Sequence, residues 1–120
     1  MSVYERPEDF TFAKDLLQLA PIEAQAFRGL KAAAERGDGA IPPKYRELIS
    51  IAVALTTQCS YCIDVHTRNA AEAGASREEI AEAVFIASAL RAGAAVGHGL
   101  LALRLFDAAS AAACERAAAA

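Results

Sequence analysis

Residues 47–66 of this chain read ELISIAVALTTQCSYCIDVH, and the rest of the sequence can be interpreted outward from this stretch. The segment from Lys44 to Thr57 places apolar residues at helical spacing, and the pattern is interrupted over 57–60 before it resumes. Cys59 is therefore predicted to lie near the start of a further helix. That helix is expected to end at Gly74, because glycine is typical of the residue just past a helix.

The same stretch carries four side chains suited to thiol chemistry. On a helix, Cys59 lies three residues before Cys62 and His66 lies four residues after it, so all three share one face. A helix N-terminus favours a thiolate at Cys59, and a neutral imidazole at His66 is placed to take the proton of Cys62. Glu47, from the preceding helix, is positioned to orient His66 or accept its proton. The two cysteines also suit reversible disulfide formation.

Other interpretations of these residues stay open. Two thiolates, one imidazole and one carboxylate form a plausible tetrahedral zinc set, although a second clustered pair of ligands is lacking. The cysteines can also act simply as small buried apolar side chains. Tyr61 either lines a substrate pocket or packs in the core. His98, between two glycines, is interpreted as a packing or helix-end residue, and Cys114 as a thiol without a partner.

The remaining sequence also predicts helices. Alanine, leucine, isoleucine and glutamate dominate, and strand-forming residues never alternate with a period of two. A first helix is expected over 7–20 and a second from Pro21 to the glycines at 37 and 39. The sequence SREE at 76–79 has the form of a capping box and opens another helix. The glycine-rich stretch 93–99 is either a break or a close helix crossing.

These elements predict an all-α fold of about six helices in one globular domain. Residues 1–41 form N-terminal helices, residues 42–110 form the core that carries the two cysteines, and residues 111–120 form an alanine-rich tail expected to fray.

Composition and charge exclude several classes of protein. Of 120 residues, 55% are hydrophobic and 22% are charged, which excludes disorder over most of the chain. A net charge of −3 without a basic stripe argues against a nucleic-acid surface. Charged residues interrupt every apolar stretch, so no membrane segment is expected, and the first ten residues do not have the pattern of a secretory signal. We expect a cytoplasmic protein.

The spacing of Glu47, Cys59, Cys62 and His66, with the stretch that continues to Phe106, resembles the AhpD-like alkylhydroperoxidase branch of the carboxymuconolactone decarboxylase family. The resemblance covers about 42–106. It implies an all-α, cofactor-free thiol peroxidase with an antioxidant role. In that family pattern Cys62 attacks the peroxide, Cys59 resolves the product into a disulfide, and His66 with Glu47 relays protons.

The resemblance also implies partners and an assembly. The substrate is expected to be a small hydroperoxide, and the reductant a thiol or a dihydrolipoyl carrier protein. Short members of the family assemble as trimers or hexamers, and we expect a homotrimer or homohexamer here. The alternatives are a redox-sensing or zinc-binding oligomer without enzymatic activity, and a lyase or hydrolase acting on a small acid, although the decarboxylase branch typically lacks the cysteine pair that this chain keeps.

Overall fold

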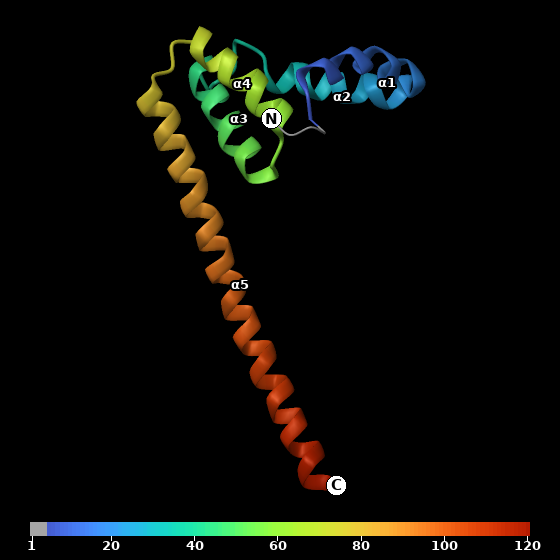
Figure 1. The fold of residues 1–120 in the computed structure, drawn as a ribbon, viewed down its shortest axis with the longest axis vertical. Coiled ribbons are helices and arrows are strands. Elements are labelled where there is room, and N and C mark those ends of the chain that lie inside the picture. Colours follow the sequence, from blue (N-terminus) through green and yellow to red (C-terminus); the bar gives the residue numbers. More distant parts are fainter. Residues whose placement is uncertain (1–4) are drawn as a thin grey trace.

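The computed structural model describes residues 5–120, and within them every regular element is a helix (Figure 1). The first regular element of the described residues is a 3-10 helix, η1 (Pro7–Phe12). Five α-helices follow: α1 (Ala13–Leu19), α2 (Pro21–Ala34), α3 (Pro43–Thr57), α4 (Ser60–Glu72) and α5 (Arg77–Ala119). The prediction of an all-α fold is confirmed.

Helix α3 is the centre of the structure, because both α4 and the first part of α5 pack against it. Ile51 is the largest fully buried side chain, and the rest of the buried apolar core is alanine. These small side chains let the three helices approach closely. The buried apolar residues are Ile51, Ala54, Ala70, Ala83 and Ala87. Glu47 of α3 is the charged residue buried among them, at 3% exposure.

The N-terminal helices form a separate arm beside α3 and α4, in which η1 packs on α1 and α1 packs on α2 (Figure 1). The expectation of one helix over 7–20 is wrong. Pro7 lacks an N–H group and opens a 3-10 turn, and the ψ of −6° at Phe12 departs from the α-helical value. The α-helix therefore begins only at Ala13.

The glycine-rich stretch 93–99 neither breaks the helix nor makes a close crossing. Helix α5 runs without interruption for 43 residues, and a Cβ added at Gly93, Gly97 or Gly99 would meet no atom within 4 Å. Each glycine costs about 1 kcal/mol relative to alanine, but the surrounding residues are strong helix formers. The same propensity explains why residues 111–119, expected to fray, form the last turns of α5.

Beyond the core, α5 extends away from the other helices (Figure 1). The radius of gyration is 21.7 Å, against roughly 14 Å for a compact chain of this length. An 18-residue window of α5 has a mean hydropathy of 1.5 and is 11% buried, so the helix is long and apolar enough to cross a membrane by length and composition alone. The expectation that no stretch suits a membrane is therefore too strong, because isolated charges do not exclude such a helix.

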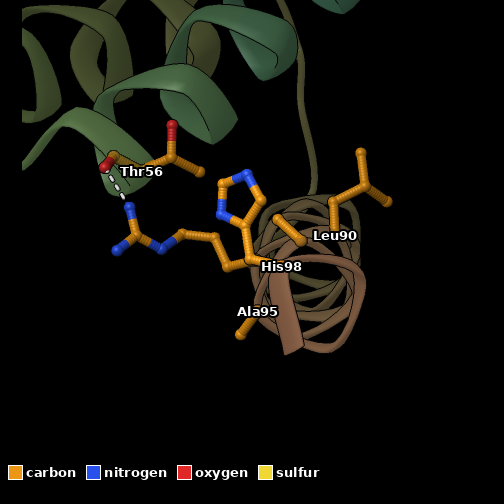
Figure 2. Close-up of a pocket in the computed structure, with 6 residues that line it drawn as sticks. Thr56, Leu90, Ala95 and His98 are labelled. Atoms are coloured by element: carbon orange, nitrogen blue, oxygen red, sulfur yellow. Dashed lines mark hydrogen bonds between the residues drawn. The ribbon is translucent and has the colours of Figure 1, made fainter. Parts of the chain in front are cut away.

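Arg91 ties α5 to the end of α3 by donating a hydrogen bond to the carbonyl oxygen of Thr56 (Figure 2). An open cavity of about 440 Å³ lies beside this contact. His98 lines this cavity and is exposed, and it lies within α5 rather than at a helix end. The cavity is lined by Thr56, Leu90, Arg91, Ala94, Ala95 and His98.

Helix α5 starts at the predicted capping box. The backbone N–H of Ser76 donates to Glu79 Oε1 at 2.9 Å, and the N–H of Glu79 donates to Ser76 Oγ at 3.1 Å. Lys44 Nζ lies 3.0 Å from Glu79 Oε2. Two hydrogen bonds hold the pKa of Glu79 below its ordinary value of 4.5. The one from the Ser76 N–H has the larger effect, and the one from Lys44 has the smaller.

This lowered pKa predicts a pH-dependent contribution of Glu79 to stability. The contribution is present above about pH 4.5 and is lost as pH falls through the lower folded-state pKa. We expect Glu79→Gln to lower the melting temperature at pH 7, and the difference from the parent to shrink as the pH falls below about 4.5. Melting followed by circular dichroism at several pH values measures this. Glu78→Gln, in the same turn, is the control, and a difference that does not change with pH would contradict the prediction.

Candidate active site

The two cysteines lie at the turn between α3 and α4. Gln58 adopts a left-handed conformation (φ 58°, ψ 44°) that ends α3, and Cys59 is the N-cap of α4, as predicted. The Sγ of Cys59 accepts a hydrogen bond from the backbone N–H of Cys62 at 3.2 Å. The two residues form a disulfide, with their Cα atoms 5.3 Å apart. Both sulfur atoms therefore sit in the first turn of a helix, where free backbone N–H groups favour a thiolate once the bond is reduced.

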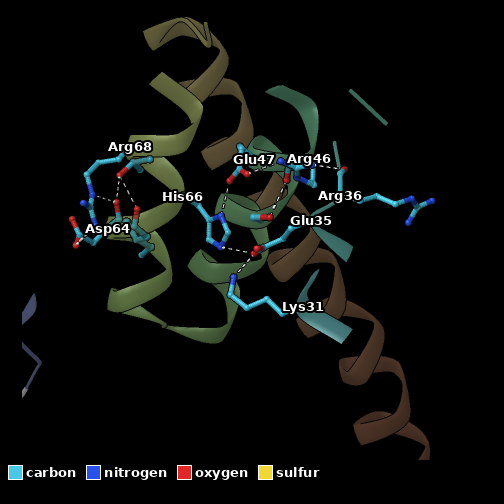
Figure 3. A network of polar contacts seen from close by, with 11 residues as sticks. Lys31, Glu35, Arg36, Arg46, Glu47, Asp64, His66 and Arg68 are labelled. Atoms are coloured by element: carbon cyan, nitrogen blue, oxygen red, sulfur yellow. Dashed lines mark hydrogen bonds and ion pairs between the residues drawn. The ribbon is translucent and has the colours of Figure 1, made fainter. Parts of the chain in front are cut away.

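One turn further along α4, His66 contacts the buried carboxylate of Glu47. The distance from His66 Nδ1 to Glu47 Oε2 is 2.6 Å, and the side chains are 13% and 5% exposed (Figure 3). Arg46 Nη2 approaches the other oxygen of Glu47 at 3.3 Å. The structure thus brings together the imidazole and the carboxylate that the sequence analysis placed on neighbouring helices. An Nδ1–H donated to Glu47 leaves Nε2 as the basic nitrogen of a neutral ring.

Two further residues approach the site from α2 and were missed by the sequence analysis. Glu35, the residue that follows α2, places Oε1 3.9 Å from His66 Nε2, and Lys31 pairs with the same carboxylate (Figure 3). Arg46 Nη1 donates to the carbonyl oxygen of Arg36 at 2.7 Å and holds the end of α2 near α3. No local spacing links Glu35 to His66, because they are distant in the sequence and meet only in the fold.

Tyr61, between the two cysteines, both packs and lines a cavity. Its hydroxyl donates a hydrogen bond to Asp9 of η1, and its ring meets Phe10 edge to face with centroids 5.6 Å apart. This hydrogen bond lowers the pKa of Asp9 and raises the pKa of Tyr61. Ser60 Oγ donates to Glu5 Oε2 at 2.8 Å, so Glu5 and η1 both contact the first turn of α4.

The cavity beside Tyr61 has a volume of about 450 Å³ and is mostly apolar. It lies next to the helix turn that holds the disulfide, which makes it a candidate binding site for the apolar part of a substrate. Its lining residues are Asp9, Phe10, Phe12, Ala13, Leu16 and Tyr61.

The geometry gives no support to a metal site in the described residues. Within 5–120, no group of three or more His, Cys, Asp or Glu side chains is arranged to hold a metal ion. With Cys59 and Cys62 joined in a disulfide, neither offers a thiolate ligand in this state. Cys114 is exposed and lies near the end of α5, far along the chain from the other two cysteines.

These features define a small all-α protein with a dithiol–disulfide site at the start of a helix and a buried histidine–carboxylate pair one turn away. The sequence profile of the carboxymuconolactone decarboxylase family matches residues 23–105. The chain belongs to this family, as the resemblance predicted.

Similar proteins and solved structures agree with this assignment. A relative from Paracoccus denitrificans, "Uncharacterized protein 4 in cox locus", is 44% identical over 70 residues, which cover 58% of this chain and 63% of the relative. The chain therefore spans less than two thirds of that relative's length. A second relative, "Uncharacterized protein H16_B0147" from Cupriavidus necator, is 35% identical over 91 residues, covering 76% of this chain and 80% of the relative.

Two crystal structures share the fold. A carboxymuconolactone decarboxylase family protein from Legionella pneumophila aligns with a TM-score of 0.63 and 31% identity, covering 69% of this chain and 73% of that one. A protein from Methanobacterium thermoautotrophicum aligns with a TM-score of 0.63 and 33% identity, covering 71% of this chain and 91% of that one.

The burial of Glu47 predicts a large effect of its removal on stability. Glu47→Ala leaves His66 and Arg46 without their partner in a part of the protein that water barely reaches. We expect the free energy of unfolding to fall by about 2–4 kcal/mol, measured by urea denaturation at a fixed protein concentration. Glu72→Ala, an exposed site on α4, is the control and should cost no more than about 0.5 kcal/mol. Equal losses in the two variants would contradict the prediction.

Proposed function

We propose that this protein is a cofactor-free thiol peroxidase that reduces a small hydroperoxide and stores the oxidation as the Cys59–Cys62 disulfide. The observation that carries the proposal is the disulfide in the first turn of α4, one turn before an imidazole held by a buried carboxylate. A thiolate that is stabilised by a helix N-terminus and has a base close by is the arrangement that activates a cysteine for attack.

The reaction begins with transfer of the Cys62 proton to His66. The thiolate of Cys62 attacks one oxygen of the hydroperoxide, the O–O bond breaks, and Cys62 becomes a sulfenic acid. The alkoxide leaves and takes a proton from His66 to become an alcohol. Cys59 then attacks the sulfur of the sulfenic acid, which forms the disulfide and releases water. Glu47 holds the ring throughout through Nδ1.

A second substrate must return the two electrons to the protein. A dithiol, such as a dihydrolipoyl group on a carrier protein, reduces the disulfide by thiol–disulfide exchange and is itself oxidised to a disulfide. A thiol-reducing compartment supplies such donors, and we therefore propose a cytoplasmic location.

The apolar cavity beside Tyr61 supports an organic hydroperoxide as substrate in preference to hydrogen peroxide. Its aromatic and aliphatic lining, including Phe10, Phe12 and Leu16, suits an alkyl or aryl group, and an apolar group of that size gains affinity from burial there.

The proposal predicts that both cysteines are needed for turnover. With a dihydrolipoyl donor and cumene hydroperoxide, we expect the parent protein to consume the peroxide, and Cys62→Ser to lose the activity. Without the donor, Cys59→Ser should react once and then stop at the sulfenic acid, because no second cysteine resolves it. Consumption of cumene hydroperoxide is followed over time, and Cys114→Ser is the matched control that should keep full activity.

The test also separates the proposal from its alternatives. After one equivalent of peroxide, a quenched digest of the reduced protein should show Cys59 linked to Cys62. If both cysteine variants consume cumene hydroperoxide as fast as the parent, the proposal fails. Activity on a small acid that survives blocking of both cysteines would indicate a lyase or hydrolase. About one zinc per chain, lost on mutation of His66, would indicate a metal-binding protein.

We also propose that the protein is a homotrimer or homohexamer whose subunits cover the apolar surface of α5. The buried apolar core is small, and a single chain leaves most of the large apolar side chains of α5 in water. The exposed large apolar residues of α5 are Phe85, Ile86, Leu90, Val96, Leu100, Leu101, Leu103, Leu105 and Phe106.

Sedimentation measures this assembly. At micromolar concentration and without detergent, we expect a mass three or six times that of the 12.6 kDa chain. Leu100→Glu should shift the mass towards the monomer, because Val96, Leu100 and Leu103 share one face of α5 and a charge there is costly to bury. Ala111→Glu, in the last turns of α5, is the control. A stable monomer, or a parent protein that needs detergent to stay in solution, would contradict the proposal.

A further inference from the structure

His66 lies between two carboxylates that come from different helices. Glu47 of α3 contacts Nδ1 at 2.6 Å, and Glu35, at the end of α2, lies 3.9 Å from Nε2 (Figure 3). The longer distance is too great for a direct hydrogen bond. It is short enough for strong attraction between a carboxylate and a protonated ring when both are partly shielded from water.

The two carboxylates differ in exposure, but each one is paired with a positively charged side chain. The side chain of Glu47 is 5% exposed and that of Glu35 is 35% exposed, so Glu35 occupies the solvent side of the ring. Each carboxylate has its own cation, Arg46 for Glu47 and Lys31 for Glu35. The charged groups that the described residues place around the ring are therefore Glu47 and Arg46 from α3, and Glu35 and Lys31 from the end of α2.

The nitrogen that Glu35 faces is the one that receives a proton. With Nδ1–H donated to Glu47, a proton from Cys62 can reside only on Nε2. Nε2 then carries its positive charge 3.9 Å from Glu35 Oε1. A nearby opposite charge favours the protonated form of the ring.

We propose that Glu35 is a positioning residue of the thiol site, which stabilises protonated His66 and thereby raises the fraction of Cys62 present as thiolate near neutral pH. Lys31 weakens this effect because it neutralises part of the Glu35 charge. Only a proton moves, from the Cys62 sulfur to His66 Nε2, and no electron is exchanged. The inference rests on one part of the proposed function, the transfer of the Cys62 proton to His66. It does not depend on the reaction with peroxide.

The alkylation rate of Cys62 by iodoacetamide reports its thiolate fraction directly. The measurement uses the full chain with Cys59→Ser and Cys114→Ser, which leaves Cys62 as the single thiol. Against this background we expect Glu35→Gln to lower the alkylation rate at pH 7 by about two- to fivefold, the size expected for the loss of one partly exposed charge. At pH 10, hydroxide removes the thiol proton without help from His66, and the two proteins should react alike.

Lys31→Met should change the alkylation rate of Cys62 in the opposite direction. Removal of the cation leaves the full charge of Glu35 facing the ring, so we expect a faster reaction at pH 7 and no change at pH 10. In the double variant Glu35→Gln/Lys31→Met the increase should vanish, because Lys31 acts through Glu35. Glu23→Gln, an exposed carboxylate on the same helix, is the matched control and should match the background at both pH values.

The outcomes separate this inference from the proposed function. An unchanged rate in Glu35→Gln at pH 7, or a rate that falls equally at pH 7 and pH 10, would overturn the role of Glu35. A decrease in the alkylation rate that is confined to pH 7 supports the role of Glu35, even if the parent protein consumes no peroxide and the peroxidase proposal fails. Circular dichroism confirms that each variant keeps its helical content, so a folding defect is recognised separately.

Discussion

The contact between Glu47 and His66 is the constraint on which the rest of the site depends. A carboxylate at 3% exposure is costly unless other groups satisfy it, and the imidazole at 2.6 Å and the guanidinium at 3.3 Å do so. This requirement fixes how α4 lies against α3. Because Cys62 lies one turn earlier on α4 and Cys59 is the N-cap of that helix, the same contact sets the position of the disulfide relative to the base.

The polar cluster also connects the two parts of the chain. The arm formed by η1, α1 and α2 shares little apolar contact with α3, yet Arg46 bonds the Arg36 carbonyl and Glu35 faces His66. In the first turn of α4, Tyr61 bonds Asp9 of η1. The arm thus contributes both an apolar cavity and a second carboxylate to the site.

The protein has a small apolar core and a large exposed apolar surface on α5. One isoleucine and four alanines are its buried apolar residues within the described chain, while α5 carries large apolar side chains in water for most of its length. Such a surface suits either neighbouring copies of the chain or a lipid environment, because both remove apolar area from water. Arg91, Arg104 and Asp107 also lie along this helix.

The sequence by itself determined the helices around the cysteines, the helix start at Cys59 and the capping box at Ser76, because these depend on spacing and caps within a few residues. It also indicated that Glu47 and His66 meet, since one short turn joins their helices. The sequence left the course of α5 through residues 93–99 open, because glycine disfavours a helix while the residues around it favour one. The 3-10 helix that begins at Pro7 was not predicted, because proline is equally suited to the first turn of an α-helix. Only the tertiary structure decided that Glu35 lies near His66 and that Asp9 bonds Tyr61. Contacts between segments far apart in the chain arise from packing and leave no periodic signal in the sequence.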